Sequence, residues 1–456
     1  MAFAAAAMAT TTSLVTGQNI GDDLIQPPFV ESDNSGVLDT MMSIDYATHV
    51  SAIHTLTDTR LLNGTMPGPT IKIKAGDTLR LRFVNNLVAQ AGRNTGENEF
   101  SYPDTSNLHF HGAHVSGELP SDDVTLRVAP GDEFQYVSHF PDIHMPGTHW
   151  IHPHVHGSGA LQVGGGAASA LIVTDPDGYL PPEVATAEDV LMVVQYMQLN
   201  DLEDIAIDSG DSRLQIQGGG GGGGGGGGNN FRLVNGQYQP TVNMVQSEWQ
   251  RWRVVYGGWQ RDALDLSINN NDCEMVLLAK DGIYIQDFPR PITLAPIPTA
   301  GRADIMVRCS NSGSFTVSDF GGTLMTINVA ASTSTPVDLP TWQPAQIPAY
   351  LQPLTNAAIS NGCSCQTRLG GQCQDGAPNC INGLGFDPHR FLHTVALGSV
   401  IERDLRGVNA HPYHQHVYPF QLVDNVDDLT GTSADYFRLG DWHDGKCREK
   451  PKLPFR

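Results

Sequence analysis

Histidine is unevenly distributed along this chain of 456 residues, and its placement is the first sign of chemistry. Of the 17 histidines, nine lie between His109 and His156, six lie at or after His389, and none lies between Gly157 and Pro388. A random scatter would not empty so long a middle. We therefore expect the two histidine-rich regions to meet in space, with the middle region serving as a spacer domain.

Three histidine groups share a His-x-His spacing, in the segments NLHFHGAHVSG, GTHWIHPHVHGSG and NAHPYHQHVYPFQL. The histidines concerned are His109 and His111, His152 and His154, and His414 and His416, with His411 just ahead of the last pair. Strand residues two apart face the same side, so each pair can direct two imidazoles at one ion or at two adjacent ions. Imidazole suits copper, zinc, iron and nickel, and the usual order of affinities favours copper. One pair alone is most often a solvated strand pair, but three together predict a polynuclear metal site.

The remaining histidines near these motifs carry no paired spacing. They are His114, His144, His149 and His156. We expect them to lie at the surface or to support the metal ligands from behind.

The amino-acid composition excludes several classes of protein. The 26 basic and 48 acidic residues give a net charge of −22, which repels a phosphate backbone and argues against nucleic-acid binding. No apolar run reaches the length of a transmembrane helix. The 49 glycines and 29 prolines, with only 16% charged residues, favour many short strands joined by turns over a helical bundle. The length exceeds what one hydrophobic core usually supports, so two or three domains are expected.

Strand patterns dominate the sequence. In TIKIKAGDTLRLRFVNNL, Ile71 and Ile73 alternate with lysines, and Leu79, Leu81 and Phe83 alternate with arginines. This period of two across a Gly-Asp turn predicts half-buried antiparallel strands.

Related patterns recur at residues 247–258 and, more weakly, at 397–408. The spacing fits three copies of one Greek-key β-domain, so the predicted fold class is all-β. We place the domains at residues 35–178, 179–337 and 338–456. The glycine run at 218–228 is predicted to be a flexible surface insertion in the second domain.

Four of the seven cysteines fall in NGCSCQTRLGGQCQDGAPNC. They are Cys363, Cys365, Cys373 and Cys380. Their spacing favours a disulfide-stapled loop over a zinc site. Together with the sequon at Asn63, this favours an oxidising compartment and secretion, although MAFAAAAMATTTSLVTGQ is an unclear signal peptide without a basic start.

The histidine motifs as a set resemble those of a known family. LHFHG, HWIHPHVHG and HPYHQH are similar, in order and domain, to three of the four copper motifs of the three-domain multicopper oxidases, cupredoxin-fold enzymes that include laccases and spore-coat-type oxidases. GPTIKIKAGDTLRLRFVNNL and LQVGGGAASALIV also look like segments of that family. The resemblance covers nearly the whole chain. It implies three tandem cupredoxin-like domains, copper as cofactor, and dioxygen and a small reducing substrate as partners. We expect the protein to be a monomer.

The resemblance also implies a role for each motif residue. His109 and His414 would hold the type 2 copper, and His411 would be one ligand of the type 1 copper. The type 3 pair would be bound by His111, His152, His154 and His416. Asp122 and Asp123 would help deliver protons to reduced oxygen, with a solvated turn as the alternative interpretation.

The fourth copper motif, His-Cys-His with further His and Met ligands, does not occur in these 456 residues. The late Cys447 lies in GKCREK without histidine neighbours, and KCREKPKLPFR breaks from the acidic character of the chain. We therefore expect a C-terminally truncated chain with an incomplete third domain and type 1 site, inactive as written. The alternative is a non-catalytic copper-binding cupredoxin-type protein. The reducing substrate stays open among phenols, aromatic amines, bilirubin-like tetrapyrroles and metal ions.

Overall fold

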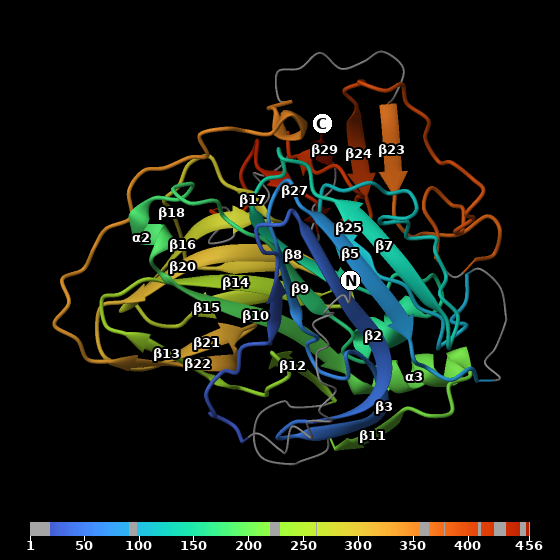
Figure 1. Cartoon of the computed structure of the whole chain (residues 1–456), viewed down its shortest axis with the longest axis horizontal. Helices are drawn as coiled ribbons and strands as arrows, with labels where there is room; N and C mark the ends of the chain where they lie inside the picture. The colour runs from blue at the N-terminus through green and yellow to red at the C-terminus, as the bar shows by residue number, and fades with distance from the viewer. Residues whose placement is uncertain are drawn as a thin grey trace.

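The computed structural model describes residues 19–90, 98–218, 229–260, 262–354, 364–377, 379–408, 412–423, 435–446 and 453–455. Strands dominate these residues, which confirms the all-β prediction (Figure 1). The described helices are α1 (Gly159–Gly164), α2 (Pro182–Ala185), α3 (Leu199–Ser209) and the 3-10 turn η1 (Ala349–Leu351). Among the described residues, no helix is both long and apolar enough to cross a membrane.

Two five-stranded sheets form the first region, in the orders β1-β4-β9-β8-β6 and β11-β3-β2-β5-β7. Their strands are β1 (Phe29–Glu31), β2 (Val37–Val50), β3 (His54–Leu62), β4 (Thr70–Ile73), β5 (Thr78–Asn85), β6 (His109–His111), β7 (Glu133–His139), β8 (Gly147–His152), β9 (Ser169–Val173) and β11 (Gln215–Gly218). Apolar side chains from both sheets meet in one buried cluster. Phe110 of β6 belongs to this cluster, so the strand that carries His109 and His111 is anchored in a continuous core.

The alternating apolar residues of β4 and β5 are buried as predicted, but their pairing is not what the pattern suggested. β4 pairs in parallel with β1 and β9, whereas β5 pairs in parallel with β2 and antiparallel with β7. The turn between β4 and β5 carries the chain from one sheet to the other. A period of two reports which side chains are buried, and it does not identify the partner strand.

The second region contains a seven-stranded sheet, β12-β10-β14-β20-β16-β17 with β18 beside β16, and a five-stranded sheet, β13-β22-β21-β15-β19. Their strands are β10 (Glu188–Gln198), β12 (Asn230–Val234), β13 (Thr241–Val245), β14 (Gln250–Gly257), β15 (Ala263–Ile268), β16 (Cys273–Lys280), β17 (Ile283–Tyr284), β18 (Arg290–Ile292), β19 (Ala295–Pro298), β20 (Arg302–Cys309), β21 (Gly313–Asp319) and β22 (Gly322–Ala330). A disulfide joins Cys273 to Cys309 across β16 and β20.

The third region is built from shorter strands. They are β23 (Ser364–Arg368), β24 (Glu402–Arg406), β25 (Tyr413–His414), β26 (Phe420–Gln421), β27 (Trp442–His443), β28 (Gly445–Lys446) and β29 (Leu453–Phe455). They form one sheet in the order β23-β24-β29 and the pairs β25-β28 and β26-β27. A second disulfide, Cys373–Cys380, closes the cysteine-rich loop as predicted, while Cys363 and Cys447 lie outside the described residues.

The three sequence patterns that suggested a repeat occupy equivalent places. β5 pairs in parallel with β2 and antiparallel with β7, and β14 pairs in parallel with β10 and antiparallel with β20. β24 likewise pairs in parallel with β23 and antiparallel with β29. The same local topology thus occurs three times along the chain.

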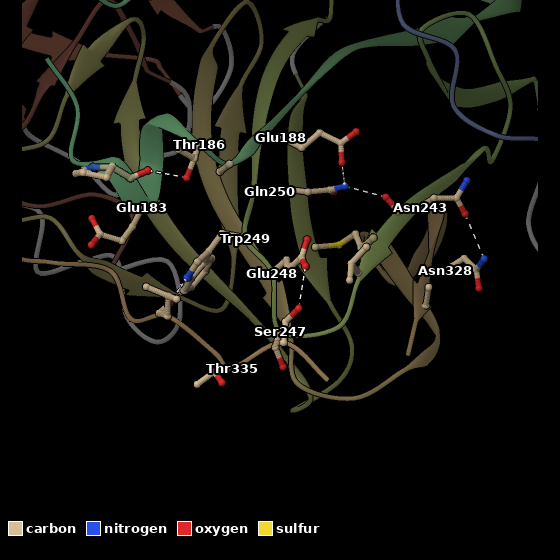
Figure 2. Close-up of a pocket in the computed structure, with 17 residues that line it drawn as sticks. Glu183, Thr186, Glu188, Asn243, Ser247, Glu248, Trp249, Gln250, Asn328 and Thr335 are labelled. Carbon is tan, nitrogen blue, oxygen red and sulfur yellow. Dashed lines mark hydrogen bonds between the residues drawn. The ribbon is translucent and has the colours of Figure 1, made fainter. Parts of the chain in front are cut away.

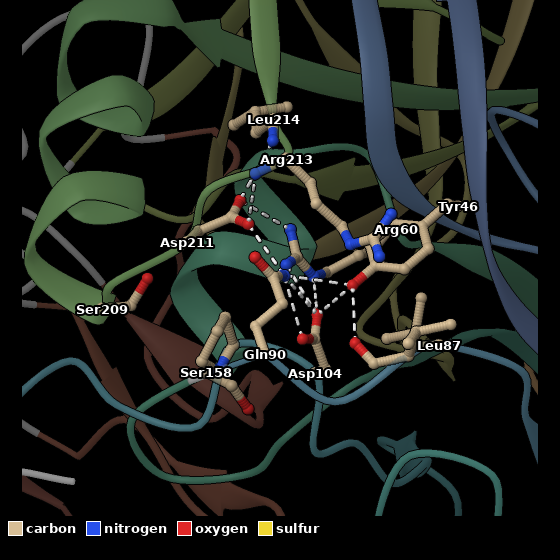
Figure 3. A network of polar contacts seen from close by, with 12 residues as sticks. Tyr46, Arg60, Leu87, Gln90, Asp104, Ser158, Ser209, Asp211, Arg213 and Leu214 are labelled. Atoms are coloured by element: carbon tan, nitrogen blue, oxygen red, sulfur yellow. Dashed lines mark hydrogen bonds and ion pairs between the residues drawn. The ribbon is translucent and has the colours of Figure 1, made fainter. Parts of the chain in front are cut away.

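Part of the segment between β10 and β12, two strands of the second region, folds back onto the first region. β11 pairs with β3, although the sequence places residues 215–218 in the second domain. Arg60 on β3 is buried and donates hydrogen bonds to Asp104 (2.7 Å) and Asp211 (3.0 Å), as Figure 3 shows. Because Asp104 lies shortly before β6, this ion-pair network fixes the approach to the first histidine motif.

Candidate metal centre

The first two histidine motifs lie side by side at the edge of one sheet. β6 pairs antiparallel with β8, and the register places His109 opposite His152 and His111 opposite Trp150. His154 follows β8 by two residues. Sheet pairing alone therefore gathers four imidazoles from two segments of the first region.

The third motif approaches from the other side of the cluster. His414 lies on β25, which pairs with β28 so that His414 faces Gly445, and His416 follows two residues later. The ring centroids of His111 and His414 are 3.9 Å apart, and those of His109 and His416 are 4.2 Å apart. The first and third regions thus meet at their histidines.

All six paired histidines form one cluster. Further ring centroid distances are 5.3 Å for His109–His152, 5.1 Å for His109–His154, 5.0 Å for His154–His416 and 4.7 Å for His414–His416. Two subsets already place one ligand atom per residue within 4.8 Å of each other: His109, His414 and His416, and His109, His111 and His152. The geometry allows more than one ion.

Hydrogen bonds to one ring nitrogen leave the other free in several of these residues. His109 Nδ1 lies 2.9 Å from Asp122 Oδ2, and His414 Nδ1 lies 2.8 Å from the Asp444 carbonyl oxygen. Neutral imidazoles in these positions donate from Nδ1 and keep the Nε2 lone pair. The Nε2 atoms of His109, His111 and His414 are buried without a hydrogen-bond partner, which is costly unless a metal ion takes their lone pairs. The donor set therefore fits copper.

Electrostatics keeps the cluster neutral at physiological pH. Burial, followed by repulsion from neighbouring imidazoles, lowers the pKa of His109 and His111 well below the ordinary value. The same causes lower the pKa of His154 to about 4. Neutral imidazole is the form that binds metal, so the ligands need not first lose protons.

The structure separates the two aspartates that the resemblance treats as a pair. Asp122 is buried, lies beside His109 and accepts a hydrogen bond from the Phe110 backbone nitrogen at 3.0 Å. Burial raises its pKa to about 8. Asp123 instead accepts hydrogen bonds from the backbone nitrogen and hydroxyl of Thr125, within its own turn. Of these two aspartates, Asp122 is the one that contacts a cluster histidine through its carboxyl group.

The unpaired histidines differ from one another in environment. His144 and His149 are buried, so the surface position suggested for them is wrong. His144 Nε2 accepts a hydrogen bond from the His114 backbone nitrogen, and the His114 ring stacks on Tyr350 at 3.8 Å. His156 is exposed and stacks on Phe386. The proposed type 1 ligand His411 lies outside the described residues.

Sequence reasoning missed two charged residues beside the cluster, Arg302 and Asp444. The Asp444 carboxylate lies 3.8 Å from His111 Nε2 and is held by two hydrogen bonds from the fully buried Arg302. A signal was present at Arg302, which opens RADIMVRC, a strand apolar enough to be buried. Nothing local in WHDG distinguishes Asp444 from a turn residue.

A separate groove of about 930 Å³ lies over the second region, between α2, β13 and the start of β14 (Figure 2). Glu183, Glu188 and Glu248 lie on its walls with Trp249. None of the residues that line it is a histidine or a cysteine. The groove is therefore distinct from the candidate metal centre.

Comparisons with known proteins agree with the fold. A family model described as multicopper oxidase matches residues 44–178. A multicopper oxidase from Staphylococcus haemolyticus is 24% identical over 415 residues, covering 88% of this chain and 79% of the relative. The crystal structure of a laccase from Pediococcus acidilactici superposes with a TM-score of 0.71 at 19% identity, covering 96% of this chain and 88% of that one.

One further relative has a different description. The cell division protein FtsP of Proteus mirabilis is 25% identical over 319 residues, covering 69% of this chain and 59% of that protein.

An all-β chain with a six-histidine cluster between its first and third regions has the architecture of the cupredoxin-fold copper oxidases. The chain is thus similar to multicopper oxidases over most of its length, with a matching family model over residues 44–178 and a shared fold, as its histidine motifs predict.

Proposed function

We propose that the six clustered histidines bind copper and form the dioxygen-reducing site of a laccase-like oxidase. The observation that carries this proposal is the set of three buried, unpartnered Nε2 atoms on His109, His111 and His414. Bound copper supplies one-electron redox chemistry, so that dioxygen is reduced to water by electrons from a small reducing substrate. The chain itself contributes neutral imidazoles, their orientation and a buried carboxylate beside them.

Within this proposal, the motif resemblance divides the ligands. His109 and His414 hold the type 2 copper, while the type 3 pair is bound by His111, His152, His154 and His416. Distance alone would group the residues differently, because the His111 ring stacks on the His414 ring, although the motifs assign these two histidines to different coppers. The division therefore rests on the motifs.

A metal count tests the copper-binding proposal directly. The purified chain is loaded with copper and dialysed, and bound copper is measured by elemental analysis and electron paramagnetic resonance. His414→Gln should lose copper, whereas His139→Gln, at an exposed histidine outside the cluster, should retain the wild-type content. A wild-type chain that retains no copper would overturn the proposal.

We further propose that the chain of these 456 residues oxidises phenols, aromatic amines, tetrapyrroles or metal ions at no useful rate. The 456 residues contain no His-Cys-His, so they offer no thiolate to link a substrate-side copper to the cluster. Oxygen consumption by the copper-loaded chain with a phenolic donor should be near background. Appending a segment with His-Cys-His and its following His and Met should give blue colour and turnover. Robust turnover without that segment would contradict the proposal.

A second candidate function is a non-catalytic copper-binding cupredoxin-type protein. Relatives named as cell division proteins favour it, because the similarity extends beyond proteins named as oxidases. The appended segment distinguishes the two: restored turnover supports an oxidase, whereas copper binding without turnover supports the second function.

We also propose that the protein is a secreted monomer. The disulfides Cys273–Cys309 and Cys373–Cys380 support an oxidising compartment. Fractionation of the native host with detection in the medium tests the location, and light scattering tests the mass of the purified chain. Retention with cytosolic markers would contradict secretion, and a dimeric mass would contradict the monomeric state.

A further inference from the structure

The guanidinium of Arg302 is fully buried at a place where all three regions meet. Arg302 is the first residue of β20, in the second region. Its Nε donates a hydrogen bond to the Thr148 carbonyl oxygen of β8, in the first region, at 3.4 Å. Its Nη1 and Nη2 donate to the two carboxylate oxygens of Asp444, in the third region, at 2.9 and 2.6 Å. One side chain therefore joins the three regions.

The remaining donors of this guanidinium are used within the second region. Nη1 also donates to the Ala300 carbonyl oxygen at 3.2 Å, and Nη2 donates to the Asp281 carbonyl oxygen at 3.0 Å. A guanidinium has five N–H donors in a planar fork, so these contacts use every donor of Arg302. Because the fork has a fixed geometry, it sets the position of Thr148 relative to Asp444.

Asp444 carries this position to a cluster histidine through its backbone. The Asp444 carbonyl oxygen accepts hydrogen bonds from His414 Nδ1 at 2.8 Å and from the Gln415 backbone nitrogen at 3.1 Å. The Asp444 backbone nitrogen donates to Asp281 Oδ2 at 3.2 Å. A hydrogen bond to one ring nitrogen orients an imidazole toward a metal ion. The carboxylate that Arg302 holds and the carbonyl that orients His414 thus belong to the same residue.

The guanidinium also lies against the backbone of both histidine-bearing strands of the first region. Thr148 is on β8, the strand that ends with His152. Gly112 directly follows His111 of β6, and a Cβ atom on Gly112 would lie 2.0 Å from Arg302 Nη2. Gly112 has a φ of +84°, which residues with a side chain rarely adopt. Only glycine therefore lets the chain after His111 pass this close to the guanidinium.

We propose that Arg302 is a positioning residue for the copper ligands, and that it sets the spacing between the first-region histidines and His414. This inference rests on the proposed copper binding by the cluster. It leaves the division of the ligands unchanged, with His111 and His414 on different coppers. It gives the second region, which contains no histidine, a part in the metal centre beyond that of a spacer.

Two substitutions separate the fork from its charge. Arg302→Lys keeps the positive charge but carries its donors on one nitrogen, whereas Arg302→Gln removes the charge. We expect both variants to bind copper about 10–100-fold more weakly in competition with a chelator. The hyperfine splitting of the copper held by His414 should also change, as measured by electron paramagnetic resonance.

Arg251→Gln is the matched control. Arg251 is a buried arginine of the same sheet, and it pairs with Asp304 at 2.6 Å and with Asp175 at 2.7 Å. Its substitution should lower the melting temperature, because it also breaks a buried ion pair. Copper affinity and hyperfine splitting should stay at the wild-type values.

A second measurement needs no metal. Without the fork, the Asp444 carbonyl oxygen should hold the Gln415 amide less firmly. Hydrogen–deuterium exchange of the metal-free chain should therefore be faster at Gln415 in both Arg302 variants. It should stay at the wild-type rate in Arg251→Gln.

Each outcome supports or overturns the positioning role. Wild-type copper affinity in Arg302→Lys would show that charge alone is sufficient, and equal losses in Arg302→Gln and Arg251→Gln would show a general loss of stability. Unchanged exchange at Gln415 in both Arg302 variants would also overturn the role. If Arg302→Gln fails to fold, Arg302→Lys decides, because it keeps a charge beside the buried Asp444. A wild-type chain that binds no copper would instead overturn the proposed function, while the exchange measurement would still test the position of Asp444.

Discussion

The two halves of the histidine cluster are held in place by different kinds of structure. The first-region half, with His109, His111, His152 and His154, lies on or just after strands of a five-stranded sheet over an apolar core. The third-region half, with His414 and His416, lies on and after β25, a two-residue strand that pairs, among the described residues, with β28 alone.

The pairing of β25 with β28 is short, and charged contacts between the second and third regions add to it. Lys280 donates a hydrogen bond to the Tyr436 carbonyl oxygen at 2.8 Å and pairs with Asp441, while Arg302 holds Asp444. These contacts fix residues 435–446, whose strand β28 positions His414. A site can thus be half preorganised by packing and half by buried ion pairs, and the two halves should respond to different substitutions.

The largest effect is expected from damage to the packed half. Phe110→Ala removes a fully buried ring between His109 and His111 and should lower the free energy of unfolding by about 3–5 kcal/mol. Calorimetry should show a lower melting temperature, with loss of copper binding. Phe134→Ala, at a partly buried ring of the same core, is the control and should cost clearly less. Equal costs would show that the core does not support the motif selectively.

The ion-paired half should be broken by Lys280→Met. Removing one partner of a buried pair costs about 3–5 kcal/mol, and here Asp441 keeps Arg290 as a second partner, so a value near the lower limit is expected. Limited proteolysis should cut faster within residues 435–446, while the melting of the first region should change little. Arg438→Met breaks a half-exposed pair with Asp287 and should cost about 1 kcal/mol or less. Unchanged proteolysis in Lys280→Met would contradict the docking role.

Removing a residue that only orients a metal ligand should have a smaller effect than damage to either half of the histidine cluster. Asp122→Asn weakens the hydrogen bond that orients His109 and should reduce copper affinity about 10–100-fold. Asp123→Asn should leave affinity near the wild-type value, because its carboxylate contacts Thr125. Titration with a copper chelator as competitor measures both. Equal losses would show that the two aspartates act together after all.

The smallest effect concerns acid stability in the first region, away from the cluster. Burial lowers the pKa of His49 to about 4 and that of His54 to about 3. Between these values and about 6.5 the unfolded chain binds protons that the folded chain does not, so stability falls as the pH drops. His49→Gln should reduce the stability lost between pH 7 and 5 by about 1–2 kcal/mol. Denaturant unfolding at both pH values checks this, and an unchanged pH dependence would contradict it.

The sequence by itself determined what depends on residues close together in the chain. Alternation over a few residues predicted the buried faces of β4 and β5, although the related pattern on β14 belongs to a strand buried on both faces. His-x-His predicted that each pair shares a strand face. The motifs also predicted the family, because each is a short run that can be read in order. The cysteine-rich loop was predicted for the same reason, since Cys373 and Cys380 are only seven residues apart.

Only the tertiary structure decided which distant groups meet. Arg302 and Asp444 are separated by 142 residues, and no local pattern encodes their hydrogen bond. Likewise, the sheet that each strand joins and the burial of His144 and His149 depend on packing between regions. Periodicity records which face of an element avoids water. The partner that covers that face is selected by the free energy of the whole packed chain.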